Sequence, residues 1–278
     1  MDLSHPDPID HLLQKVTVIR DWNSTTSSIL SVFDNAKTVA LDVEGVDLGR
    51  NGCICLIQLA TRDHCALFDV LNKKLDDPVV IWLKTLLQDK NITKIVHDCR
   101  MDSDALKHIA QIHLTNVHDT SCWHNVLCDV EDANLNAVLK SNGFIENKKR
   151  DSSVYKNNHE FWKQRPLTQQ MVEWASGDLQ GLFKVYDLQT SAPENQQINA
   201  KALSDEFVNF ARNARVATVQ VRNPARFIGS GGCKIRNLKS KTNTLLYHRG
   251  DRSQNNWMVY YTTDAQLNQV IQTERGSR

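Results

Sequence analysis

Two acidic residues stand two positions apart at the end of a strongly apolar segment. Asp42 and Glu44 follow the run at residues 38–41, and alternate residues of a strand project from the same face. Two carboxylates in one place form a natural shelf for a metal ion. An isolated D-x-E pair is also common on solvent-facing edges, but the apolar runs 38–41 and 54–57 favour an internal strand.

Two further acids are candidates for the same site. Asp102 follows the short apolar run at residues 94–97, and a helix starting near it would place its carboxylate at the helix entrance. A plain N-cap role for Asp102 or Ser103 is the ordinary alternative. Asp178 is the only acid on the inner face of the helix expected over residues 169–187, and an unpaired buried carboxylate is costly.

A glycine-rich loop near the C-terminus has the composition of a phosphate-binding turn. Residues 228–235 read Ile-Gly-Ser-Gly-Gly-Cys-Lys-Ile and separate two predicted helices. Glycines allow close approach of the backbone, and the N-terminus of the following helix attracts phosphate. A dinucleotide site would need G-x-G-x-x-G directly after a strand, and that context is absent here. The candidate nucleic-acid-binding residues are Gly229, Ser230, Gly231, Gly232, Lys234, Arg236 and Lys239.

The elements that must carry the acids indicate a mixed α/β domain. Apolar runs separated by glycine and aspartate turns predict three hairpin-linked strands, after which strands and helices alternate. The apolar positions of residues 169–187 fall on one helical face, which predicts a long helix that closes the domain. The expected fold is a mixed sheet flanked by helices. The predicted strands are 38–43, 53–60, 65–70 and 94–97, and the predicted helices are 79–87, 103–109 and 169–187.

A second, smaller unit follows. The stretch 190–197 has the Ser, Pro and amide content of a linker, and residues 200–214 predict a connecting helix. From Ala217 the pattern gives a strand, two helices, two strands and a helix, the order β-α-α-β-β-α of a small α+β domain. We therefore expect three segments: a first domain over 1–192, a linker with its helix over 193–213, and a second domain over 214–278.

Charge and composition narrow the partners. Residues 213–278 contain eleven Lys or Arg against three acids, a net charge of +8, whereas residues 1–212 contain 22 against 29, a net charge of −7. A basic module beside an acidic body suits nucleic-acid binding next to a cation site, although two ordinary solvated surfaces give the same totals.

No run reaches the roughly 18 apolar residues of a membrane span, so we expect a soluble chain without membrane contact. Seven cysteines without C-x-x-C spacing predict reduced thiols in an intracellular protein, cytoplasmic or nuclear.

The acidic motifs resemble, in order, those of the DEDD superfamily of 3′-to-5′ exonucleases, RNase D type. Residues 41–45 are similar to the first motif and residues 96–106 to the second. Residues 161–168, followed by 174–178, are similar to the segment that leads into the third. The resemblance covers roughly residues 25–190 and implies a ribonuclease H-like fold.

The resemblance also implies an activity. Residues 44–52 and 102–106 are most similar to the Egalitarian-like branch, and the C-terminal module resembles a eukaryotic-type KH domain with the full I-G-x-x-G-x-x-I pattern. The implied protein is a 3′-to-5′ exoribonuclease that releases nucleoside 5′-monophosphates, with single-stranded RNA as partner and DNA possible. Hard oxygen ligands suit Mg²⁺ or Mn²⁺. The implied ligands of two such ions are Asp42, Glu44, Asp102 and Asp178.

One position departs from the RNase D pattern. That type has a tyrosine four residues before the last aspartate, where it orients the attacking water, but this chain has Trp174. An indole has one N–H donor and no acceptor, so it cannot copy a phenol. A catalytically inactive RNA-binding adaptor on the same fold is therefore the alternative function. The loop 147–158, rich in Lys, Asn and Ser, either covers the site or is disordered.

Overall fold

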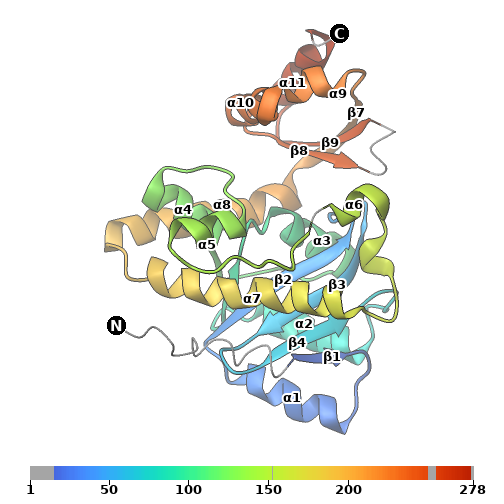
Figure 1. Ribbon diagram of the computed structural model, residues 1–278, viewed down its shortest axis with the longest axis vertical. Coiled ribbons are helices and arrows are strands. Elements are labelled where there is room, and N and C mark those ends of the chain that lie inside the picture. The colour runs from blue at the N-terminus through green and yellow to red at the C-terminus, as the bar shows by residue number, and fades with distance from the viewer. Residues whose placement is uncertain (1–15, 152, 250–254, 277–278) are drawn as a thin grey trace. The chain divides into compact units, whose positions relative to one another are not determined.

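The computed structural model describes residues 16–151, 153–249 and 255–276 (Figure 1). The chain divides into two compact units, residues 1–212 and 213–278. Among the described residues, no helix has both the length and the apolar character to cross a bilayer.

A six-stranded mixed sheet forms the centre of the first unit. Its order is β1-β4-β3-β2-β5-β6. Strands β2, β3 and β4 pair antiparallel, as expected from the hairpin pattern, whereas β1, β5 and β6 join parallel to their neighbours. The strands are β1 (Val16–Ile19), β2 (Thr38–Val46), β3 (Cys53–Ala60), β4 (Cys65–Asp69), β5 (Thr93–Val96) and β6 (Val117–Asp119).

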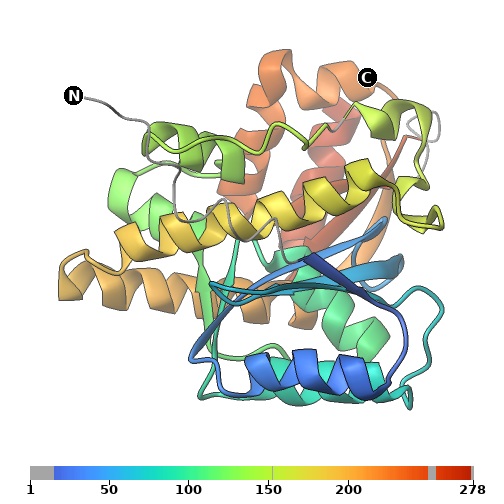
Figure 2. The same ribbon diagram turned by 60° about the horizontal axis from the view of Figure 1, so that its bottom comes forward.

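Helices cover both faces of this sheet. Helices α1, α2 and α3 bury apolar side chains against one face, and α5 and α7 do so against the other. Figure 2 shows α7 in yellow on one side of the sheet and α1 in blue on the opposite side. The helices are α1 (Ser24–Asp34), α2 (Pro78–Gln88), α3 (Arg100–Ala110), α4 (Thr120–Cys128), α5 (Leu135–Ser141), α6 (Val154–Asn157) and α7 (Gln169–Gln189), with a 3₁₀ turn η2 (Phe161–Lys163) before α7.

The end of the first unit differs from the expected domain boundary. Residues 194–213 form one helix, α8 (Glu194–Asn213), where a linker was expected at its start. This helix packs on the first unit, because Val208 is buried in the same core as α1 to α3. Ser103 Oγ also donates to Val208 O at 2.8 Å. The segment is therefore a helix of the first unit, and its apolar contacts lie far away in the sequence.

The second unit has its own sheet and core. Its order of elements is the expected β-α-α-β-β-α, and its antiparallel sheet has the order β7-β9-β8. A core of buried side chains that includes Phe227, Trp257 and Val259 joins the helices to this sheet. The elements are β7 (Arg215–Gln220), α9 (Pro224–Ile228), a 3₁₀ turn η3 (Ser230–Gly232), α10 (Cys233–Thr242), β8 (Leu245–Arg249), β9 (Asn256–Tyr261) and α11 (Asp264–Gly276).

Candidate active site

The central strand β2 presents Asp42 and Glu44 on the face of the sheet that α7 covers. Ala40, two residues before Asp42, packs in the core beneath α7, and the side chains of a strand alternate between faces. The register of β2 against β3 shifts just after Glu44. Gly45 occupies this bulge, where a Cβ would collide with the Cys53 carbonyl.

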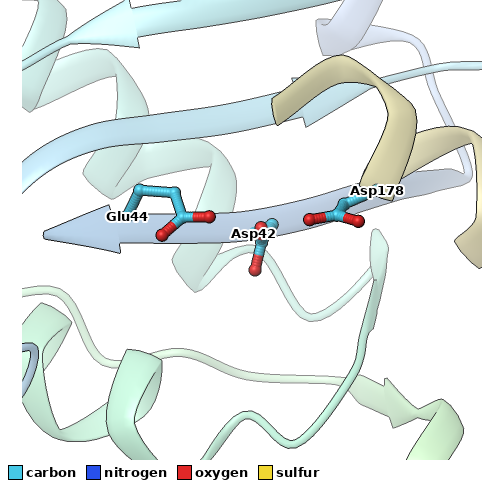
Figure 3. A group of neighbouring side chains, drawn as sticks. All are labelled: Asp42, Glu44 and Asp178. Carbon is cyan, nitrogen blue, oxygen red and sulfur yellow. The ribbon is translucent and has the colours of Figure 1, made fainter. Parts of the chain in front are cut away.

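Helix α7 adds the third carboxylate. Oxygen atoms of Asp42, Glu44 and Asp178 all lie within 4.8 Å of one another (Figure 3). Asp178 is only 1% exposed, and the other two are partly buried. The structure thus brings together three acids that are separated by up to 136 residues in the sequence.

Asp102 lies beside this group without belonging to the tight cluster. It occupies the first turn of α3 and is 7% exposed. The N-cap of α3 is Cys99, and it makes no side-chain capping bond, so the N-cap role considered for Asp102 and Ser103 is wrong. The pKa of Asp102 is raised mainly by burial, and the negative charge of the nearby Asp42 raises it further.

Burial and mutual repulsion make these acids hard to ionise. Burial, with the charge of Asp178, raises the pKa of Asp42 to about 7. The pKa values of Glu44 and Asp102 are raised well above their ordinary range, mainly by burial. The pKa of Asp178 is raised by burial, which outweighs the opposing effects of Arg150 and Asn147. A bound cation would remove this penalty, and an all-carboxylate donor set fits hard divalent ions.

A loop that the sequence left ambiguous lies over the carboxylates. Asn147 Nδ2 donates to Asp178 Oδ1 and to Trp174 O, both at 2.9 Å. Arg150 Nη1 donates to Asp178 Oδ2 at 2.8 Å. Asn147 is itself fixed by its backbone, which exchanges hydrogen bonds with the Asn136 side chain at 2.9 and 3.1 Å. Of the two alternatives for this loop, these residues show the one in which it covers the site.

Gln58 also contacts a carboxylate of the site, and the sequence-based prediction did not include it. It lies opposite Asp42 on β3 and is fully buried. With its amide nitrogen facing the site, it donates to Asp42 Oδ2 at 3.1 Å and to Ala175 O at 3.2 Å. A signal was present, because Gln58 is the one polar side chain other than cysteine in residues 53–60, and a buried amide needs partners.

Trp174 belongs to an aromatic cluster behind Asp178. Its ring centroid lies 5.9 Å from those of Tyr155 and Phe161 and 5.5 Å from that of Trp162. The residue is 1% exposed. Its Nε1–H has no partner with hydrogen-bond geometry in the described part of the chain, although the indole is close enough to Asp178 to favour the charged carboxylate.

The glycine-rich loop of the second unit adopts a conformation that requires glycine. Gly229, Gly231 and Gly232 have φ values of 76°, 55° and 77°, in the region that residues with a Cβ rarely adopt. Arg236 Nη1 donates to Gly231 O at 2.7 Å and so holds the loop. Lys239 Nζ lies 5.7 Å from the centre of the Tyr247 ring. The loop and Arg236 therefore lie at the start of α10, whereas Lys239 lies in its last turn.

The fold and the carboxylates define a nuclease domain, and the family comparison agrees. Residues 18–190 match the family described as 3′-5′ exonuclease, and the chain belongs to this family. Exonucleases of this family use divalent metal ions, for which the cluster of Asp42, Glu44 and Asp178 supplies carboxylates.

Curated relatives share this part of the chain. The piRNA biogenesis protein EXD1 of Mus musculus is 30% identical over 134 residues, which are 47% of this chain and 21% of that protein. Exosome complex component 10 of Homo sapiens is 26% identical over 199 residues, 67% of this chain and 21% of that protein. The chain therefore spans about a fifth of these two relatives. The Egalitarian homologue of Caenorhabditis elegans matches only 33% of this chain, so the Egalitarian branch stays a prediction.

Solved structures show the same fold. The crystal structure of Trypanosoma brucei RNase D superposes with a TM-score of 0.65 at 22% identity and covers 79% of each chain. A structure of the same protein in complex with RNA U12 gives a TM-score of 0.63 at 23% identity, over 78% of this chain and 77% of that one. Together with the sheet topology, these matches show a mixed α/β fold with a central sheet flanked by helices.

Proposed function

We propose that this protein is a metal-dependent 3′-to-5′ exonuclease that shortens single-stranded RNA and releases nucleoside 5′-monophosphates. The observation that carries the proposal is the cluster of Asp42, Glu44 and Asp178 oxygens within 4.8 Å, with Asp102 buried beside it. These four acids would hold two Mg²⁺ or Mn²⁺ ions.

The protein residues around the cluster suit this chemistry. When bound, two divalent ions supply Lewis-acid activation of a water and stabilisation of the leaving 3′ oxygen. Gln58 and Asn147 hold Asp42 and Asp178 in fixed orientations through the bonds described above. The guanidinium of Arg150 provides a positive charge where the scissile phosphate would arrive.

RNA is the preferred substrate, with DNA second. Support comes from the Trypanosoma brucei RNase D, which was solved in complex with RNA U12, and from the net charge of +8 in residues 213–278. The seven cysteines, all of which are unpaired, are consistent with an intracellular protein, cytoplasmic or nuclear.

Residues 214–278 would act as a KH module that binds the RNA. The order of elements, the positive φ values of the loop glycines and the basic residues Lys234, Arg236 and Lys239 support this role. Trp257, Tyr260 and Tyr261 are buried at 9% exposure or less, so they belong to the core and are not base-stacking residues.

The direction of cleavage and the identity of the products test the proposal. A 5′-labelled single-stranded RNA with a free 3′ hydroxyl should shorten stepwise in Mn²⁺, and chromatography should identify nucleoside 5′-monophosphates. A matched RNA with a blocked 3′ end should stay intact. Cleavage of both substrates at internal positions would contradict an exonuclease that enters at the 3′ end.

A second function, a non-catalytic RNA adaptor, is favoured by one observation. Trp174 occupies the position expected for the water-orienting tyrosine, and it is buried in an aromatic cluster. Calorimetric titration with Mn²⁺ separates the two functions. Saturable binding that Asp178→Asn weakens supports the nuclease, whereas tight RNA binding without Mn²⁺ binding supports the adaptor.

A further inference from the structure

A phenol lies next to the position where the sequence lacks one. Tyr155 comes from the short helix α6, and its ring centroid lies 5.9 Å from that of Trp174. It also packs edge-on against Phe161 at 6.4 Å. The aromatic cluster that holds Trp174 therefore also fixes a tyrosine that belongs to a different segment of the chain.

The hydroxyl of Tyr155 is held with its proton available. Trp162 Nε1 donates to Tyr155 Oη at 2.7 Å, which uses one acceptor position of the phenol. No acceptor for the Tyr155 proton lies within hydrogen-bond distance among the side chains that the structure describes. A phenol can donate one hydrogen bond and accept others, so the donor side remains for a water or a phosphate oxygen.

The carboxylates of the site act on this hydroxyl. Burial raises the pKa of Tyr155, and the charges of Glu44 and Asp42 raise it further against the opposing charge of Arg150. The hydroxyl is thus within electrostatic range of both β2 carboxylates. It stays protonated at neutral pH, so it can orient a water but cannot accept a proton from it.

We propose that Tyr155 contacts the attacking water through its hydroxyl and so replaces, from α6, the phenol that α7 lacks at Trp174. This inference rests on the proposed exonuclease function. The hydrogen bond from Trp162 restricts the orientations of the hydroxyl. A purely structural role, in which Tyr155 only satisfies the buried Trp162 indole, makes different predictions for the variants below.

Three variants of the full chain test the proposal in Mn²⁺ with 5′-labelled single-stranded RNA. Tyr155→Phe should lower kcat by about tenfold or more, as loss of one oriented donor does, while KM stays within about twofold. Adding Trp174→Tyr to that variant should restore at least part of kcat. Tyr186→Phe is the matched control, because Tyr186 packs on His118 at 4.6 Å outside the site, and its kcat should be unchanged.

Calorimetry with Mn²⁺ alone supplies a readout that is independent of turnover. Tyr155→Phe should bind Mn²⁺ as wild type does, because the phenol is placed on the water and not on the ions. Loss of Mn²⁺ binding in this variant would mean that Tyr155 only maintains the local structure, and would overturn the proposal.

The remaining outcomes separate this inference from the proposed function. Equal kcat for wild type and Tyr155→Phe would overturn the role of Tyr155 and leave the exonuclease intact. An inactive wild type that Trp174→Tyr activates would show that Tyr155 does not replace the missing phenol. Inactivity of both proteins would reject the exonuclease function, and the role of Tyr155 with it.

Discussion

The clustered carboxylates carry a cost in the metal-free protein. Each has a raised pKa, and burial is the main cause for Asp42, Glu44, Asp102 and Asp178 alike. Because the folded-state pKa values lie above those of the unfolded chain, the folded protein binds protons more readily than the unfolded chain does. Protonation of these acids therefore contributes stability at low pH. That stability is lost as the pH rises through the folded pKa, which for Asp42 is about 7.

Divalent ions should therefore stabilise the protein more at alkaline pH than at acid pH. We expect millimolar Mn²⁺ to raise Tm by about 5 °C near pH 8, and by clearly less near pH 5.5, where protons compete for the carboxylates. Differential scanning fluorimetry measures both shifts. Asp178→Asn should reduce the shift at the higher pH, and an equal shift in wild type and variant would contradict a site at these acids.

Asn147 should contribute to stability through Asp178 and the Trp174 carbonyl. Asn147→Ala leaves both acceptors without this donor, and we expect a loss of about 1–3 kcal/mol in the free energy of unfolding, measured by urea titration. Asn195→Ala, on the exposed side of α8, is the matched control and should change stability by less than about 0.5 kcal/mol. Similar losses in both variants would argue against the bonds of Asn147.

At the scale of single residues, the sequence indicated the acids better than it indicated the residues that donate hydrogen bonds to them. Asp42 and Glu44 share a strand face, and that relation follows from their spacing alone. Asn147 and Arg150 reach Asp178 from a loop about 30 residues away, and Gln58 reaches Asp42 across a strand pair. No periodicity reports such contacts, because they depend on how the loop and the strands pack.

At the scale of elements, side-chain contacts fix the C-terminal end of the long helix α7. Asp178 lies near its middle, over β2, and Gln189 lies at its C-terminal end. Gln189 Oε1 bonds His118 Nε2 of β6 at 2.9 Å, and Gln189 Nε2 donates to Thr120 O at 2.9 Å. His118 also stacks on Trp123 of α4 at 4.1 Å. These contacts fix the helix that presents Asp178.

His118 should make this docking sensitive to acid. Burial lowers its pKa to about 4, whereas an unfolded histidine titrates near 6.5, so the unfolded chain binds the proton first. The stabilising contribution is present above about pH 6.5 and falls by about 2 kcal/mol at pH 5. Urea unfolding at about pH 7.5 and pH 5 should show that His118→Phe loses less stability on acidification than wild type. Equal losses would contradict a neutral buried His118.

Helices and strands with a clear pattern of apolar residues were predicted from the sequence, and those without such a pattern were missed. The apolar runs of β2, β3 and β4 and the amphipathic face of α7 gave these elements close to their observed bounds. Strand β1 has only four residues, and α1 is rich in Ser and Thr, so neither shows a clear period. Pro193 directly precedes α8, and the first residues of α8 include several amides. Both features are typical of a linker, whereas the packing of Val208 in the core of the first unit is a tertiary contact that the local sequence does not indicate.

At the scale of the whole molecule, the opposite charges of the two units suggest a division of labour. The first unit carries the carboxylates and a net charge of −7, and the second carries the glycine-rich loop and a net charge of +8. Under the proposed function, an RNA bound by the basic unit would have a higher local concentration of 3′ ends at the tethered acidic unit. The sequence predicted this asymmetry directly, because net charge needs no knowledge of contacts.

Acidic residues in the glycine-rich loop should uncouple binding from cleavage. A Cβ at Gly231 meets nothing within 4 Å, and Asp tolerates a positive φ better than most residues. We expect Ser230→Asp with Gly231→Asp to weaken RNA binding by about tenfold or more and to raise KM, with kcat unchanged. Fluorescence anisotropy and cleavage rates measure these effects. The double Asn variant is the neutral control, and an equal loss of affinity in it would argue against phosphate contact at this loop.

The most direct test of the account is single-turnover cleavage of a 5′-labelled single-stranded RNA in Mn²⁺ by wild type and by Asp42→Asn. This substitution keeps the size of the side chain and removes the charge of one central carboxylate. We predict a ladder of products shortened from the 3′ end with wild type and none with the variant. No shortening by a wild-type protein that binds both RNA and Mn²⁺, or equal shortening by the two proteins, would contradict an exonuclease built on these carboxylates.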